Sequence, residues 1–286
     1  MIRLKAYAKL NLSLDIRGKR SDGYHELDSI MQSIDLYDTI TIEKADALRV
    51  QMDMPGVDER RNTAYAAAEA FFAHTGISGG AHIAIQKRIP AQSGLGGASA
   101  DAAAVLIGLN RLYGVGLSPD ALRMLGKRVG ADVPFALIGG TARAQGIGEI
   151  LTPLYPKKTF HYVIIKPAQG VPTAEAFARY RASEHVSIDS VEYALLKGDL
   201  ELFLRFAGNA LGLAALAVAP QILRAADALM AASAPKALMT GSGSAMFSPF
   251  ETLEAAQQAA HRVHGDFVYI GAHSAAASGI EIEEEI

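Results

Sequence analysis

One segment of the chain combines the residue types that bind phosphate. Pro90 to Asp101 reads Pro-Ala-Gln-Ser-Gly-Leu-Gly-Gly-Ala-Ser-Ala-Asp and lies between an expected strand and an Ala-rich helix. Glycines let backbone N–H groups approach a ligand closely, and a helix N-terminus adds unpaired N–H groups with positive dipole character. The segment therefore predicts a phosphate site. Read alone, it is explained about equally well as a strand-to-helix turn capped by Ser99 or Asp101.

Two better-known phosphate motifs fit this segment poorly. The Walker pattern needs Gly-Lys-Ser/Thr, and no lysine follows these glycines. A dinucleotide fingerprint needs a third glycine where Ser99 stands, and an acid that ends a strand about 20 residues further on. Asp120 has that spacing but sits beside Pro119 at an expected helix start. A dinucleotide-dependent oxidoreductase is therefore the weaker alternative.

Lys9 and Asp132 are candidates for acid–base and charge-stabilising roles. Lys9 lies on the polar face of an alternating strand from Ala8 to Arg17, which we predict to be half-buried behind Leu10, Leu12, Leu14 and Ile16. Asp132 lies in an otherwise apolar run, residues 129–137, where an unpaired carboxylate is costly, so a cationic partner is expected. Taken alone, each residue is better explained as a surface or turn residue.

Three motifs in order resemble those of the GHMP kinases, the superfamily of galactokinase and of homoserine, mevalonate and phosphomevalonate kinases. They are Ala8–Leu12, the glycine-rich segment and Met239–Ala245. Arg20–Leu27 (Arg-Ser-Asp-Gly-Tyr-His-Glu-Leu) and Gly130–Phe135 (Gly-Ala-Asp-Val-Pro-Phe) are similar to the members that phosphorylate CDP-methylerythritol in the non-mevalonate isoprenoid pathway. The resemblance covers nearly the whole chain.

The resemblance implies an ATP-dependent kinase that phosphorylates the 2-hydroxyl of CDP-methylerythritol, giving the 2-phosphate and ADP. Mg²⁺ is expected to arrive with the nucleotide. Lys9 and Asp132 become the catalytic pair: Asp132 accepts the hydroxyl proton, while Lys9 orients the hydroxyl and offsets charge as the phosphoryl group moves.

Nucleotide contacts are implied along the glycine-rich segment and at two residues before it. Asn62 is equally explained as a helix cap, and Lys87 as a solvated strand end. The family loop usually reads Gly-Leu-Gly-Gly-Gly-Ser-Ser, so Ala98 and Ala100 depart from it and Ser99 is the only hydroxyl of the usual pair. The full set is Asn62, Lys87, Pro90, Ala91, Gln92, Ser93, Gly94, Leu95, Gly96, Gly97, Ala98, Ser99 and Ala100.

Substrate contacts are implied at four residues. Tyr24 and His25 would meet the cytosine ring, and Phe177 would close its other face. Asn11, about 7 Å along the strand face from Lys9, can reach the same substrate. Without the resemblance, Tyr24 and His25 belong to a surface hairpin and Phe177 to a helix core. By resemblance, Gly241–Ser244 packs beside the phosphate loop; its alternative is a simple turn.

The elements around these residues predict an α+β chain in two halves. Further strands are expected at Ser29–Ile34, Thr39–Ile42, Ala81–Ile89 and near Ala142 and Ile150, with helices at Ala64–Ala73, Ala98–Leu112 and from Ser118 to Gly126 or Gly130. A Pro- and Lys-containing stretch after residue 152 suggests a boundary. We expect an N-terminal domain at 1–155, carrying the ATP phosphate loop, and a C-terminal domain at 156–286. The resemblance implies the two-domain GHMP kinase fold, with an N-terminal ribosomal S5 domain 2-like half and a C-terminal ferredoxin-like α/β sandwich.

The second half repeats the mixture of strands and helices. Strands are expected at His161–Ile165, Ala237–Thr240, through Phe247 and at Phe267–Ile270, and helices at Ala174–Arg181, Gln221–Ala232 and Glu251–Val263. The acidic end, Glu281–Glu285, is expected to be a solvated tail.

Composition excludes several classes of function. The 286 residues include 27 lysines and arginines against 30 acids, so no global basic field attracts nucleic acid or an anionic membrane. Cysteine is absent, which excludes disulfides and thiolate chemistry. No leader is evident at the start, and no apolar run approaches the roughly 20 residues that span a bilayer. We expect a cytoplasmic monomer or weak homodimer that acts on a small molecule.

His261 and His264 have a zinc-binding spacing but no evident third ligand, so no protein-held metal is expected.

Three alternatives to this function stay open. One is another kinase of the superfamily, of the homoserine or mevalonate type, against which Tyr24 and His25 argue. The others are the dinucleotide-dependent oxidoreductase and a nucleotide-binding protein without catalysis.

Overall fold

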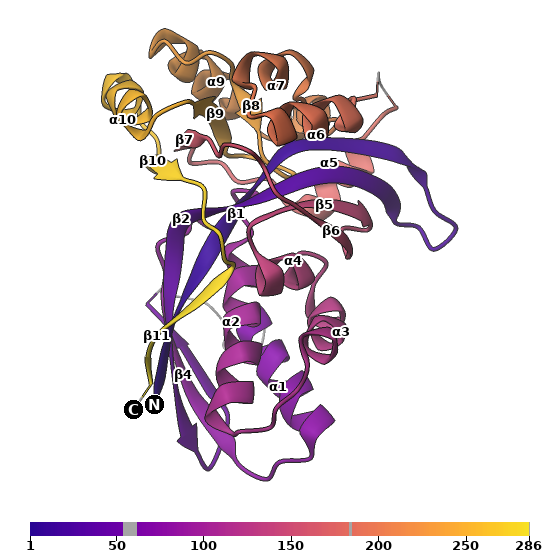
Figure 1. The fold of residues 1–286 in the computed structure, drawn as a ribbon, viewed down its shortest axis with the longest axis vertical. Helices are drawn as coiled ribbons and strands as arrows, with labels where there is room; N and C mark the ends of the chain where they lie inside the picture. Colours follow the sequence, from indigo (N-terminus) through magenta and orange to yellow (C-terminus); the bar gives the residue numbers. More distant parts are fainter. Residues whose placement is uncertain (54–61, 183–184, 286) are drawn as a thin grey trace.

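Two sheets with packed helices form the computed structural model of the chain, which describes residues 1–53, 62–182 and 185–285 (Figure 1). Within those residues the first sheet has seven strands and the second has four. The first sheet contains β1 (Ile2–Lys19), β2 (His25–Ala45), β3 (Arg49–Met52), β4 (Gly80–Gln86), β5 (Thr141–Gly146), β6 (Ile150–Leu154) and β11 (Ile280–Glu285). The second contains β7 (His161–Lys166), β8 (Leu238–Met239), β9 (Met246–Phe250) and β10 (Tyr269–Ser274).

The helices divide between the two halves of the molecule. The first four lie in the lower half of Figure 1 and the others in the upper half. They are α1 (Thr63–Thr75), α2 (Gly97–Leu112), α3 (Pro119–Val129), α4 (Val133–Ile138), α5 (Thr173–Arg179), α6 (Ile188–Lys197), α7 (Leu200–Phe206), α8 (Gly212–Val218), α9 (Gln221–Ala231) and α10 (Leu253–Arg262). Of these, α4, α6, α7 and α8 were not anticipated from the sequence.

Helix caps explain why the elements beside the site begin and end where they do. Asn62 accepts a hydrogen bond from the N–H of Ala64 at the start of α1, and Gly76 ends that helix in the left-handed conformation, as predicted. Ser118 caps α3, which continues to Gly130; the alternative end at Gly126 is wrong. Gly126 is buried inside the helix, close to the side chain of Val133.

The hairpin of β1 and β2 connects the two halves. The strands are 18 and 21 residues long, pair antiparallel along most of their length, and run from the lower to the upper half of Figure 1. Helix α2 packs on them below and α6 above. The two strands predicted at Ser29–Ile34 and Thr39–Ile42 are therefore one continuous strand.

A bulge in β1 overturns its predicted faces. Asn11 pairs with Met31 and Ser13 with Ile30, so Leu12 is an extra residue and the side-chain alternation reverses there. Leu10 and Leu12 pack in one core cluster, whereas Leu14 and Ile16 pack in another. Because the C-terminal half covers the second face, the polar residues are buried too, and the prediction of a half-buried strand is wrong. They are Lys9, Asn11, Ser13 and Asp15.

The acidic C-terminal segment is a strand, so the predicted tail is wrong, although Glu281–Glu285 are exposed as expected. β11 pairs antiparallel with β1, and the chain ends lie together in Figure 1. Glu283 contacts Arg3 at 3.3 Å and Lys5 at 3.1 Å, and Glu281 accepts a hydrogen bond from the Tyr7 hydroxyl. Alternating basic and hydroxyl side chains on β1 thus hold an edge strand of alternating acids.

The predicted boundary between residues 155 and 156 falls between β6 and β7, the point where the chain leaves the first sheet for the second. The last strand, β11, returns to the first sheet. The division into two domains at that residue stays a prediction. Among the described residues no single helix has the length and apolarity to cross a membrane; α8 and α9 meet the requirement only jointly, across a bend of 118°.

Candidate active site

A cavity of about 580 Å³ lies where β1, the glycine-rich segment and the Gly241–Ser242 turn meet. This volume is within the range of about 300–1,000 Å³ that is typical of small-molecule sites. The structure brings most of the predicted site residues to its wall. They are Lys9, Asn11, Asn62, Lys87, Pro90, Ala91, Gln92, Ser93, Gly94, Gly96, Gly97, Ala98, Ser99, Asp132 and Phe177.

Four predicted residues are absent from the described lining of this cavity. Leu95 and Ala100 turn their side chains into the two core clusters beneath the segment. Tyr24 is 61% exposed and follows a turn in which its N–H donates to Asp22. His25 lies outside the lining but contacts Phe177, which is part of it.

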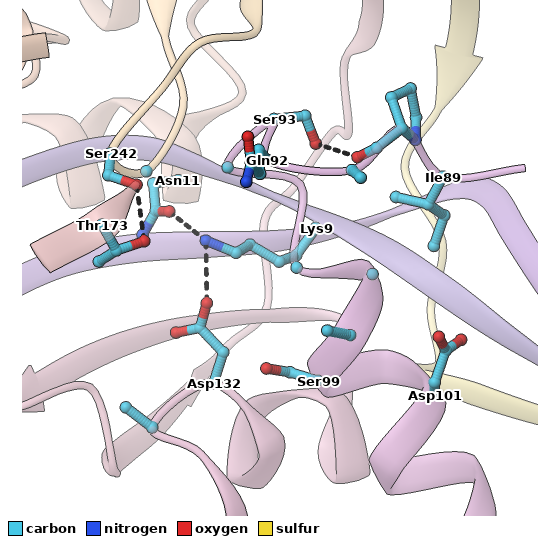
Figure 2. Close-up of a pocket in the computed structure, with 18 of the residues that line it drawn as sticks. Lys9, Asn11, Ile89, Gln92, Ser93, Ser99, Asp101, Asp132, Thr173 and Ser242 are labelled. Carbon is cyan, nitrogen blue, oxygen red and sulfur yellow. Dashed lines mark hydrogen bonds and ion pairs between the residues drawn. The ribbon is translucent and has the colours of Figure 1, made fainter. Parts of the chain in front are cut away.

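Lys9 joins three elements of the site. Its Nζ donates to Asn11 Oδ1 at 2.5 Å and lies 3.2 Å from Asp132 Oδ2, as Figure 2 shows. Its aliphatic stem crosses Gly96, where an added Cβ would be 2.8 Å from Lys9 Cγ. Its backbone N–H donates to Leu95 O at 2.9 Å. The glycine at 96 therefore admits both the positive φ of the loop and the side chain of Lys9.

Asn11 is held by its own partners on both sides. Its Nδ2 donates to Ser29 Oγ at 2.8 Å, and Ser29 in turn donates to Ser13 O at 2.7 Å. Its backbone N–H donates to Thr240 Oγ1 at 2.8 Å. These bonds fix the amide with its oxygen toward Lys9, so Asn11 helps to set the direction of the ammonium group.

Asp132 stands at the start of α4 without capping it. Its side chain makes no cap hydrogen bond, and Val133 N–H donates to Gly130 O in the turn before it. Lys9 is the cationic partner that the apolar surroundings predicted. The carboxylate is nevertheless 35% exposed, because it faces the cavity rather than the core. One oxygen, Oδ2, contacts Lys9, and the other, Oδ1, has no hydrogen-bond partner among the described residues.

The glycine-rich segment presents backbone N–H groups to the cavity. Gly96 is the N-cap of α2, in the left-handed region with a φ of 75° and without a side-chain cap, so capping by Ser99 or Asp101 is wrong. Ser99 and Ala100 donate their N–H groups to Gly96 O. The preceding residues of the first turn, Gly97 and Ala98, line the cavity. Their position suits an anion at a helix N-terminus.

The segment from Gly241 to Ser244 packs beside this loop, as the resemblance implied. A Cβ on Gly94 would be 2.3 Å from Thr240 O, and Ala245 N–H donates to Ser93 O at 3.0 Å. Ser242 Oγ lies 3.0 Å from the Thr173 hydroxyl at the start of α5. The two halves of the molecule therefore meet through glycine backbone at the cavity rim.

The side chain of Lys87 is only 11% exposed and contacts two buried carboxylates beneath the loop, so the alternative of a solvated strand end is wrong. Its Nζ contacts Asp38 and lies 2.6 Å from Asp101 Oδ2. Burial alone would lower the pKa of Lys87, but the charges of Asp101 and Asp38 outweigh it and raise that pKa. Asp38 also accepts the N–H groups of Arg88 and Ile89 through Oδ1. The cluster thus fastens the end of β4 to β2 and α2.

Burial raises the pKa of Asp101 to about 7, with the charge of Lys87 opposing the shift and that of Asp38 adding to it. Asp101 Oδ1 has no hydrogen-bond partner among the described residues, which is consistent with a poorly stabilised carboxylate. Sequence reasoning missed this role, because the position of Asp101 near a helix start suggested a cap.

Some of the aromatic side chains predicted to bind the substrate lie beside the cavity. The rings of His25 and Phe177 stack with centroids 5.2 Å apart and an interplanar angle of 26°, and Tyr180 meets His25 edge-on. Partial burial, with the charge of Lys19, lowers the pKa of His25, so its ring is neutral near pH 7. Phe177 lines the cavity and also packs on the core, so its core position does not exclude the predicted contact with the substrate, which stays a prediction.

Several cavity residues were not singled out from the sequence. Leu14 reaches the lining through the bulge in β1, and Leu27 lies on the paired strand. Ile147 belongs to the β5–β6 turn and Thr173 begins α5. Leu27 ends the Arg20–Leu27 motif but had no role assigned, and the predicted alternation placed Leu14 on the wrong face.

No group of three or more His, Asp or Glu side chains suited to a metal occurs in the part of the chain that the structure describes. His261 Nδ1 contacts Gln257 O within its own helix at 2.8 Å. Asn62 caps α1 and also lines the cavity, so neither of its interpretations excludes the other.

Comparison with known proteins gives consistent results. Residues 62–140 match the GHMP kinases N terminal domain, and residues 191–269 match the GHMP kinases C terminal domain. A 4-diphosphocytidyl-2-C-methyl-D-erythritol kinase from Carboxydothermus hydrogenoformans is 44% identical over 88% of this chain and 90% of its own length. The same-named protein from Pelotomaculum thermopropionicum is 40% identical over 92% and 93%.

Solved structures share the fold. The crystal structure of a 4-(cytidine 5'-diphospho)-2C-methyl-D-erythritol kinase superposes with a TM-score of 0.79, at 33% identity over 96% of this chain and 99% of that one. A homoserine kinase from Cytophaga hutchinsonii superposes with a TM-score of 0.78 at 18% identity, over 98% of this chain and 96% of its own. The second likeness concerns the fold alone.

Proposed function

Because the chain belongs to the GHMP kinases, small-molecule kinases that use ATP, we propose that its acceptor is 4-diphosphocytidyl-2-C-methyl-D-erythritol, in non-mevalonate isoprenoid precursor synthesis. The γ-phosphoryl group of ATP would pass to the 2-hydroxyl, giving the 2-phosphate and ADP. Relatives that carry this substrate in their names match the chain at 37–44% identity over most of its length. That similarity extends through both halves and supports the substrate as well as the reaction class.

The observation that carries the mechanism is the Lys9–Asp132 ion pair at the edge of the glycine-rich loop. A hydroxyl that attacks phosphorus needs positioning, charge neutralisation and an acceptor for its proton. Asp132 has an oxygen facing the cavity that can accept this proton. Lys9, directed by Asn11, would orient the attacking hydroxyl and offset the charge of the moving phosphoryl group.

The nucleotide would bind along residues 90–100. The N–H groups at the start of α2 and the left-handed glycines at 94 and 96 would hold the phosphates, since this loop lacks a Walker lysine. Asn62 lines the same cavity and would lie near the base end of ATP, and Lys87 would support the loop from below.

Mg²⁺ would enter with ATP rather than bind at a site built by the protein. Oxygen ligands suit this ion, and the cavity offers the Ser99 hydroxyl and the open oxygen of Asp132. When bound, Mg²⁺ would neutralise the charge of the β- and γ-phosphates. Ala100 is buried in the core, so the hydroxyl that is usual at this position in the family has no counterpart here.

The cytosine end of the substrate would bind at the hairpin between β1 and β2. His25 and Phe177 are stacked beside the cavity, and Tyr24, which precedes His25 in the sequence, is exposed. A neutral imidazole can both donate and accept a hydrogen bond, which suits a neutral base. We propose that Tyr24, His25 and Phe177 together recognise this ring.

An ADP-release assay with three acceptors tests the function. With ATP and Mg²⁺, the protein is expected to release ADP in the presence of CDP-methylerythritol, and the product should carry one additional phosphate on the methylerythritol portion. Mevalonate and homoserine are the matched controls, because kinases of the same fold act on them. Turnover with either control in preference to the cytidine substrate would overturn the assignment.

We further propose a cytoplasmic monomer or weak homodimer with a domain division near residue 155, and no binding to nucleic acid or membranes. The net charge of −3 supports the last point. Sedimentation at several protein concentrations would give the oligomeric state.

A further inference from the structure

We propose that Glu149 is a positioning residue for phosphoryl transfer: it holds the β5–β6 turn in the shape that places Ile147 and Gly148 beside Asp132. The turn runs from Gly146 to Glu149. The inference rests on the proposed function, because it concerns the same site. Glu149 itself is not expected to contact the phosphates or the substrate; it acts through the turn.

Glu149 fastens the turn from within. Its Oε2 accepts the N–H of Ile147 at 2.7 Å, and the carboxylate lies against Gly146, where an added Cβ would be 2.6 Å from the same oxygen. The N–H of Gly148 donates to Gln145 O at 3.1 Å. The Glu149 side chain is largely buried. A carboxylate therefore occupies the interior of the turn and replaces the solvent that would otherwise satisfy its backbone.

The turn forms the wall next to the proposed base. Ile147 lines the cavity together with Asp132. A Cβ on Gly148 would lie 3.9 Å from Asp132 Oδ1 and equally far from Ala131 O. Lys9 contacts the other oxygen, Oδ2. The turn thus lies on the side of Asp132 Oδ1, the oxygen assigned to accept the proton, and limits the directions from which a hydroxyl can approach it.

The charge of Glu149 is stabilised in this place. Burial would raise its pKa, but the N–H groups of its own residue and of Ile147, together with Lys127, outweigh burial and lower it. Oε1 faces outward and lies 3.2 Å from Lys127 Nζ on α3, whose side chain is half exposed. The two oxygens therefore have separate tasks, one inside the turn and one at the surface, and variants can separate them.

Steady-state kinetics of three variants test the proposal. Glu149→Ala is expected to lower kcat about 10- to 100-fold, since small displacements of reacting groups cost rates of that order, while the KM for ATP changes little. Glu149→Gln retains an oxygen for the Ile147 N–H and should recover most of the loss. Lys127→Ala removes only the outer ion pair and should leave kcat within about twofold.

A merely structural role would give a different pattern. It would lower the melting temperature and raise the KM of both substrates without a selective fall in kcat. Equal kcat in wild type and Glu149→Ala, with the wild type active on the cytidine substrate, would overturn the inference and leave the function intact. A wild type inactive on that substrate would instead contradict the function.

Gly148→Ala tests the same wall without removing Glu149, in case the alanine variant at 149 fails to fold. The added methyl would face Asp132 Oδ1 and the residue would keep a left-handed φ of 113°. Gly116→Ala is the matched control, since Gly116 also has a positive φ, of 73°, but nothing lies within 4 Å of an added Cβ. We expect kcat to fall at least fivefold more for Gly148→Ala than for Gly116→Ala; equal values would contradict the proposal.

Discussion

Two lysine–carboxylate groups lie beside the glycine-rich loop, Lys9 next to Gly96 and Lys87 next to Gly97, and they differ in how far their carboxylates are exposed. Lys9 pairs with Asp132, and Lys87 with Asp38 and Asp101. Both lysines line the same cavity. Asp132 is 35% exposed, whereas the side chains of Asp38 and Asp101 are 0% and 2% exposed.

This difference distinguishes a carboxylate that can take part in the reaction from one that holds the loop in place. Asp38 gives Oδ1 to two backbone N–H groups and Oδ2 to Lys87, so no oxygen remains for a substrate. Asp132 lines the cavity and makes no cap hydrogen bond, and its Oδ1 has no hydrogen-bond partner among the described residues. A group that must accept a proton needs an open oxygen and access to the reacting hydroxyl. A group that holds a loop is stabilised by hydrogen bonds to its oxygens, as Asp38 is; Asp101 Oδ1 is the exception, since it is buried without a partner among the described residues.

The largest expected effect is that of Asp132→Asn on turnover. Loss of the proposed base should reduce kcat by about 10²- to 10⁴-fold, because the amide cannot accept the hydroxyl proton. Binding of ATP, measured by titration calorimetry, and the melting temperature should change little, since Asp132 is partly exposed and does not cap α4. Turnover equal to that of the wild type would remove Asp132 from the mechanism and make the two groups alike.

The Lys9–Asp132 pair could be predicted from the sequence, and the cluster of Lys87, Asp38 and Asp101 could not. Lys9 and Asp132 lie in motifs that specifically resemble those of known kinases. Asp132 is also the lone acid in an apolar run, which predicts a cationic partner. Asp38 carries no such signal: it is one polar residue in a long strand. Its partner Lys87 is distant in the chain, so only the pairing of β2 with β4 brings them together.

The errors in the predicted fold have the same origin. A period of two predicts which residues of β1 share a face, but one extra residue at Leu12 reverses that pattern without any mark in the sequence. The acidic end looks like a solvated tail until β1 supplies Arg3 and Lys5 opposite it. Local signals such as the Asn62 cap and the Gly76 stop were sufficient for α1. The sequence pattern did not predict which distant segments pair with one another.

In the second prediction the substitution lowers stability and changes turnover little, the opposite of the first. Asp38→Ala should lower the free energy of unfolding by about 3–5 kcal/mol, because it leaves Lys87 with a single partner and orphans two buried N–H groups. At a temperature where the variant is folded, kcat should stay within about tenfold of wild type. Urea unfolding provides the measurement, and Asp46→Ala, at an exposed turn residue, is the control. A stability change within about 0.5 kcal/mol, as expected of surface substitutions, would contradict the supporting role.

The third prediction concerns how stability depends on pH. Burial raises the pKa of Asp101 from 3.8 to about 7, so between these values the folded state retains a proton that the unfolded chain has released. The free energy of unfolding should therefore fall as pH rises from about 4 to about 7, by at most about 1.4 kcal/mol per pH unit, and then level off. Asp101→Asn carries no such proton and should flatten this slope, while Asp120→Asn, an exposed acid on α3, should keep it. Urea unfolding of the three proteins at pH 5, 6, 7 and 8 gives the slopes. An unchanged slope in Asp101→Asn would mean that Asp101 is ionised in the folded protein, which would contradict the raised pKa.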